Sequence, residues 1–263
     1  MPPRDINLGF MSMRHAPLAE RAAAAAQAGF NGIALRADRW AETLRCGGSG
    51  RRIRALLDDH GLRVSEIEPL RLLRDDLLEA VVEMVQTLGA PRVQVTPPID
   101  GTAVDLAAAA KWLQKAAERL PDTLLAIEFL PPTDVPDAAI ALRLIDQAGG
   151  ASNLGLCVDS WHVFRGGGLA SLAGLDAARV HAIQINDGPL RATVPDYIED
   201  CIRFRVPCGQ GAFDLAGFMH LLPPTTAINV EVINEELDRL PFTQLAQLLY
   251  DSTVATLKAC DRR

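Results

Sequence analysis

The chain has 263 residues, of which 49% are hydrophobic and 22% are charged. This length supports a substantial core in one soluble globular domain, and among undivided folds it is typical of α/β barrels and a few all-β folds. The net charge is −7 and the 26 basic residues are scattered, which excludes a basic nucleic-acid surface. No apolar run reaches the roughly 18 residues of a membrane span and no signal-peptide pattern occurs, so neither is expected.

The cysteines indicate the compartment. None of the five belongs to a CxxC pair, and Cys157 lies inside a predicted core strand. Neither a disulfide framework nor a zinc knuckle is indicated, so a reducing cytoplasm is expected. No linker or low-complexity tract divides the chain, so residues 1–263 are predicted to form one domain. The expected partner is a small molecule, with no nucleic acid and no membrane, and a homo-oligomer is left open.

Short apolar runs alternate with longer helical patterns from one end of the chain to the other. The runs predict eight strands, at residues 7–12, 32–36, 63–68, 92–97, 124–130, 154–159, 180–186 and 227–233. The segments between and after them have apolar residues at three and four spacing, which predicts helices at 17–29, 49–61, 74–89, 102–120, 135–149, 168–180, 213–222 and 242–259. Eight such units predict a single (β/α)8 TIM barrel, because parallel strands buried on both faces read as nearly continuous apolar runs. A doubly wound sheet is the main alternative, but no GxGxxG follows the first strand.

Four of the later strands each carry a polar residue at or near their end. They are Glu128, Asp159, Gln184 and Glu231. A carboxylate or amide in such a run costs several kcal/mol unless it is bound, so four in succession suggest a shared partner. Active sites of these barrels lie at the carboxyl ends of the strands, where all four fall. Three carboxylates and an amide oxygen suit Mn²⁺ or Mg²⁺, with Co²⁺ or Zn²⁺ as alternatives. The other interpretation is a hydrogen-bond network without a metal.

Five motifs make the chain resemble the xylose isomerase-like barrels, a family that includes sugar phosphate isomerases and epimerases, inosose dehydratases and 3-dehydroshikimate dehydratases. The motifs are IEFLP around Glu128, VDSWHVFRGGG around Asp159, IQIND around Gln184, RVPCGQG from Arg205 to Gly211, and NVEVIN around Glu231. The resemblance covers essentially the whole chain. It implies that the four polar residues are metal ligands, with histidine at the Gln184 position in many members.

Four side chains outside the ligand set, His162, Glu68, His15 and Arg205, are candidates for catalysis or substrate binding. His162 stands three residues after Asp159, near a substrate on the metal, and histidine can move a proton at neutral pH. The resemblance also implies that His162 transfers a proton. The alternative is that this histidine fixes the loop or supports a metal ligand. Glu68 ends the third predicted strand, and His15 follows the first. Both are predicted to contact substrate, although His15 also suits a solvated loop.

Arg205 precedes the CGQG turn. The resemblance implies that its guanidinium reaches the substrate pocket, where its planar fork suits a carboxylate, a phosphate or vicinal oxygens. Cys208 replaces the usual proline of this loop, which alters the expected path of the chain. The alternative is a surface arginine paired with Asp196, Glu199 or Asp200.

The expected chemistry follows from a metal beside a carbonyl group. It stabilises the enediolate formed when an α proton is removed. The first prediction is therefore an isomerase or epimerase of a small sugar or polyol, with a polyhydroxy carbonyl substrate and Glu128 and Glu231 as opposed acid and base. The second is a 3-dehydroshikimate or inosose dehydratase with His162 as the base, which Gln184, the DSWH motif and the EVIN strand favour. A sugar-binding barrel without catalysis is the third.

Overall fold

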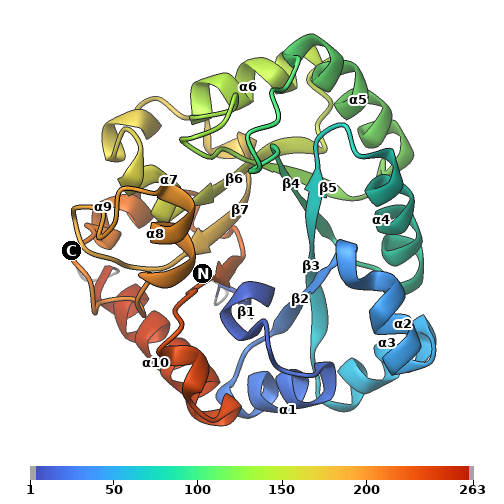
Figure 1. The fold of residues 1–263 in the computed structure, drawn as a ribbon, viewed down its shortest axis with the longest axis vertical. Coiled ribbons are helices and arrows are strands. Elements are labelled where there is room, and N and C mark those ends of the chain that lie inside the picture. Colours follow the sequence, from blue (N-terminus) through green and yellow to red (C-terminus); the bar gives the residue numbers. More distant parts are fainter. Residues whose placement is uncertain (1–3, 261–263) are drawn as a thin grey trace.

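The computed structural model describes residues 4–260, which form a closed barrel of parallel strands in the order β1 to β8 (Figure 1). The strands are β1 Ile6–Leu8, β2 Gly32–Arg36, β3 Arg63–Arg71, β4 Arg92–Thr96, β5 Leu124–Glu128, β6 Leu154–Asp159, β7 Val180–Ile185 and β8 Ile228–Val230. The predicted TIM barrel is confirmed. Since β1 pairs with β8, the sheet closes and leaves no free edge.

Helices cover the outside of the barrel (Figure 1). They are α1 Leu18–Ala28, α2 Trp40–Gly47, α3 Gly50–Asp59, α4 Asp75–Leu88, α5 Leu106–Arg119, α6 Ala138–Gln147, α7 Ser160–Arg165, α8 Tyr197–Arg203, α9 Leu215–His220 and α10 Phe242–Cys260. Helices α1 and α4 end at Gly29 and Gly89 in the left-handed conformation, as their sequence patterns predict. Among the described residues, no helix has the length and apolar character needed to cross a membrane.

The first strand is shorter than its sequence pattern predicts. The pattern extends over residues 7–12, but β1 ends at Leu8 and a 3₁₀ turn occupies Phe10–Met13. Ser12 explains the difference, because its hydroxyl donates to the carbonyl of Val230 and accepts from the amide of Val232, both at 2.8 Å. The side chain thus satisfies backbone groups at the end of β8 that a longer first strand would have paired.

The helix predicted at residues 168–180 is wrong. The chain forms α7 directly after β6, and then only two 3₁₀ turns, Leu169–Leu172 and Ala177–Arg179. Gly174 between the two turns has a φ of 76°, a conformation that ends a helix. The early start of α7 matters for the site, because it places His162 in the first turn after the barrel strand.

The interior of the barrel holds several buried polar side chains. Most of the apolar core lies between the strands and the helices, whereas Ala126, Cys157 and Ala182 form a separate small cluster. Gln94 on β4 donates to Gln184 on β7, and since these strands are not neighbours, the contact crosses the interior. Small side chains on three strands therefore leave room inside the barrel for polar groups from the others.

Candidate metal and catalytic site

The four predicted ligands lie at the same mouth of the barrel. Glu128 and Asp159 are the last residues of β5 and β6, Gln184 is next to last in β7, and Glu231 follows β8 directly. Asp159 is in register with Gln184 on the neighbouring strand. All four are buried, with at most 6% of their surface exposed. All strands of a parallel barrel end at the same mouth. Residues at strand ends that are far apart in the sequence therefore lie close together in space.

Gln94 connects two of these residues. Its Nε2 donates to Glu128 Oε2 at 3.1 Å and to Gln184 Oε1 at 3.2 Å. The amide orientation of Gln184 follows from this contact, because its oxygen is the accepting atom. Gln94 therefore holds one carboxylate and one amide oxygen in fixed positions, as a residue that supports metal ligands would.

Arg205 connects the other two. Its Nη1 donates to Asp159 Oδ2 at 2.9 Å and to Glu231 Oε2 at 3.0 Å, while its Nε donates to the carbonyl of Cys201 at 3.1 Å. Only 1% of Arg205 is exposed, so the alternative of a surface arginine paired with residues of α8 is wrong. The guanidinium instead lies among the predicted ligands and compensates part of their negative charge.

His162 lies beside the same carboxylates. Its Nε2 is 3.2 Å from Glu128 Oε1 and 3.8 Å from Asp159 Oδ2, and its Nδ1 makes a hydrogen bond with the hydroxyl of Tyr197. Glu128, Asp159 and His162 each offer a ligand atom within 4.8 Å of the others. His162 therefore has two roles open to it, as a further metal ligand or as a proton carrier, and Tyr197 fixes its ring in either case.

The charges in this site fit a divalent cation. Burial, with repulsion from Glu68, Asp159 and Glu128, raises the pKa of Glu231 well above its usual range despite Arg205. Glu128 Oε1 is buried and has no well-aligned hydrogen bond among the described residues. Three carboxylates beside one guanidinium in a buried site therefore favour a bound proton or cation, and an oxygen-rich donor set is what Mg²⁺ and Mn²⁺ prefer.

We expect the protein to bind one divalent ion per chain. Since the site exists only in the folded barrel, saturating Mn²⁺ should stabilise the fold by about 2 to 3 kcal/mol at 100 times its Kd and raise the Tm by several degrees. Thermal melts and elemental analysis of chelator-treated and refilled protein measure this. A refilled protein with no retained metal and an unchanged Tm would contradict the metal site.

The two remaining substrate-binding candidates differ in position. Glu68 is 1% exposed at the carboxyl-terminal part of β3, and burial together with the charge of Glu66 raises its pKa to about 8. Its carboxyl group also contributes to the raised pKa of Glu231, so it lies within electrostatic range of the predicted ligands. His15 is different, because its side chain is 65% exposed and lies 3.5 Å from Asp238. Within residues 4–260 its polar contacts are with Arg14 and Asp238 and not with the carboxylate cluster, a position that agrees with the solvated-loop alternative.

Three residues of the site were not identified from the sequence. Gln94 interrupts the apolar run of β4 in the way that Gln184 interrupts β7, so the same signal could have found it. Asn186, whose Nδ2 donates to Asp159 Oδ1 at 2.8 Å, follows β7 and gives a similar signal. Tyr197 gives none, because it begins a short helix in the loop between β7 and β8 and reaches His162 only through the path of that loop.

A family comparison agrees with this geometry. Residues 22–250 match the family described as xylose isomerase-like TIM barrel. The chain belongs to this family. A 3-dehydroshikimate dehydratase from Pseudomonas aeruginosa is 31% identical over 248 residues, which cover 85% of this chain and 37% of that protein. The chain thus spans little more than a third of this curated relative.

Solved structures support the fold. A xylose isomerase-like TIM barrel/4-hydroxyphenylpyruvate dioxygenase fusion protein is 23% identical with a TM-score of 0.82, and the match covers 98% of this chain and 44% of that one. The IolI protein, solved with a bound zinc atom, is 20% identical with a TM-score of 0.85, over 97% of this chain and 98% of that one. At these identities the likeness establishes the barrel and no activity.

Proposed function

We propose that this chain is a divalent-metal-dependent dehydratase that removes water from a small polyhydroxy ketone of the 3-dehydroshikimate type. The observation that carries the proposal is the position of His162, a buried imidazole 3.2 Å from a predicted ligand and held by Tyr197. The 31% identity to a 3-dehydroshikimate dehydratase supports the substrate class. The isomerase or epimerase placed first from the sequence becomes the second candidate, favoured by the buried Glu128 and Glu231 in one site.

Each group has a distinct part in this reaction. A cation held by Glu128, Asp159, Gln184 and Glu231 would polarise the substrate's carbonyl oxygen. In the tautomer in which Nδ1 of His162 donates to Tyr197, Nε2 presents a lone pair and can take the proton from the carbon next to the carbonyl. The same imidazolium then returns that proton to the hydroxyl on the following carbon, so a C–O bond breaks, a C=C bond forms and water leaves. The reaction is redox-neutral and needs no further reactant.

The direct test is product analysis. Loss of water from 3-dehydroshikimate and enolisation give a dihydroxybenzoate, which is aromatic and is followed by its ultraviolet absorbance. The chain should be assayed with Mn²⁺, Mg²⁺, Co²⁺ and Zn²⁺ against 3-dehydroshikimate, inososes and a panel of ketoses. An aromatic product supports the proposal, whereas rearranged ketoses alone would replace it with the isomerase, and no turnover of any of them would favour a binding barrel.

Tyr197 gives a prediction specific to the dehydratase. Its hydroxyl bonds Nδ1 of His162, so Tyr197→Phe removes the group that fixes the ring and its tautomer. Such a hydrogen bond is worth about 1 kcal/mol, so kcat should fall about 5- to 10-fold and its pH profile should shift, with metal affinity unchanged. Tyr250→Phe, on α10 at the outside of the barrel, is the matched control. An unchanged kcat and pH profile in Tyr197→Phe would show that this contact does not position His162.

A further inference from the structure

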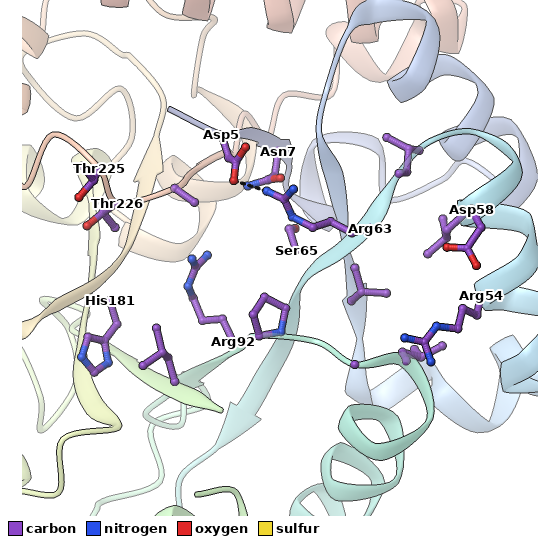
Figure 2. Close-up of a pocket in the computed structure, with 18 of the residues that line it drawn as sticks. Asp5, Asn7, Arg54, Asp58, Arg63, Ser65, Arg92, His181, Thr225 and Thr226 are labelled. Carbon is purple, nitrogen blue, oxygen red and sulfur yellow. Dashed lines mark hydrogen bonds and ion pairs between the residues drawn. The ribbon is translucent and has the colours of Figure 1, made fainter. Parts of the chain in front are cut away.

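A second polar cavity lies at the opposite mouth of the barrel (Figure 2). It has a volume of about 640 Å³ and is lined by residues at the starts of strands, including Asn7 of β1, Ser65 of β3, Arg92 of β4 and His181 of β7. The predicted metal ligands lie at the strand ends, so this cavity is separate from the site described above. Neither the sequence motifs nor the proposed reaction assigns it a role.

Arg92 is the central feature of this cavity. It is the first residue of β4, two positions before Gln94, and therefore points to the same side of the strand, into the barrel. Figure 2 shows its side chain extending into the cavity. Arg92 is only 7% exposed, and its Nε and Nη1 have no hydrogen-bond partner among the described residues. The carboxylate of Glu66 balances part of its charge, but Oε2 lies 3.7 Å from Nη1, which is too far for a hydrogen bond.

Three further polar atoms in the lining lack hydrogen-bond partners in the described part of the chain. They are Asn7 Oδ1, Ser65 Oγ and His181 Nδ1, all buried. A register shift between β6 and β7 turns His181 over Gly155, where an added Cβ would lie 2.5 Å from the imidazole ring. Burial, and then the positive charge of Arg92, lowers the pKa of His181. Buried groups of this kind carry a desolvation cost unless something bonds to them.

We propose that this cavity binds a small oxyanion, a phosphate or carboxylate group carried by a small molecule, with Arg92 as its charged anchor. A guanidinium forms paired hydrogen bonds to such groups, and it loses less hydration than an ammonium when buried. The hydroxyl of Ser65 supplies a neutral hydrogen-bond donor at the same cavity. The volume lies within the usual range of small-molecule sites, so it also has room for the molecule that carries the anionic group.

The test is calorimetric titration of the full chain with inorganic phosphate and, separately, with malonate, at constant ionic strength and without added metal. Wild-type protein should bind at least one of the two. Arg92→Met should weaken that binding at least about 10-fold, and Arg92→Lys, which keeps the charge and loses the fork, should have an intermediate effect. Arg143→Met, at an exposed position of α6, is the control for general charge loss, and Glu231→Gln is the control for binding at the other mouth.

Circular dichroism shows whether each of the two Arg92 variants is folded, so a loss of binding can be separated from a loss of structure. Binding that depends on Arg92 and survives both controls supports the oxyanion site. Equal binding by a folded Arg92→Met protein, or no binding of either anion to wild type, overturns it. If Arg92→Met fails to fold, wild-type affinity in Arg92→Lys overturns the proposal and weaker affinity supports it. None of these results depends on the reaction at the opposite mouth.

Discussion

His162→Ala is expected to lower kcat by about 10² to 10⁴-fold on the substrate found in the panel, with metal affinity nearly unchanged. The reason is geometric, because the imidazole lies 3.2 Å from Glu128 and is held by Tyr197, while both carboxylates beside it keep Gln94 or Arg205 as partners. Turnover, Mn²⁺ titration and the entry of solvent deuterium at the α carbon measure the effect.

The matched control is His220→Ala, which removes an exposed histidine of α9. Its turnover should equal that of wild type. Under the isomerase alternative, where the two glutamates move the protons, His162→Ala should mainly raise KM. Deuterium exchange at the wild-type rate in the alanine variant would eliminate His162 as the base. A large loss of metal affinity would instead assign it to the metal, together with Glu128 and Asp159.

Glu231→Gln should reduce turnover at least about 10³-fold and weaken Mn²⁺ binding at least about 10-fold. The substitution removes a charge and keeps the shape of the side chain. Arg205 retains Asp159 as a partner at 2.9 Å, so no buried guanidinium is left unpaired. The free energy of unfolding of the metal-free protein should therefore change little. Removing one of several carboxylates that repel each other offsets part of the stability lost with the Arg205 contact.

Glu236→Gln, at an exposed position a few residues later, controls for the loss of one negative charge. Both variants are depleted of metal, refilled with Mn²⁺ and compared for turnover, affinity and urea midpoint. Wild-type activity in the refilled Glu231→Gln protein would show that Glu231 is not a ligand. If Glu231→Gln gives no folded protein, Asp159→Asn replaces it in the test. The same losses of turnover and Mn²⁺ affinity are then expected.

The sequence determined the barrel because its information is local. A parallel strand covered on both faces must be apolar along most of its length, so seven of the eight predicted strands lie where the structure has them, within a few residues at their ends. The predicted extent of the first strand was wrong at Ser12, which bonds to Val230 on a strand more than 200 residues away. The helix at 168–180 failed because a single Gly174 outweighs a good apolar pattern.

The site likewise has a part that the sequence predicts and a part that depends on the tertiary structure. A carboxylate at the end of an apolar strand is visible in the sequence, which is why Glu128, Asp159 and Glu231 can be grouped from their positions along the chain alone. Tertiary structure decided that Arg205 is buried against two of them and that Tyr197 holds His162, since both come from the loop between β7 and β8, whose path depends on packing. The cavity around Arg92 likewise needs the closed barrel, because a strand's first residue becomes a buried cation with unsatisfied donors only when the other strands surround it.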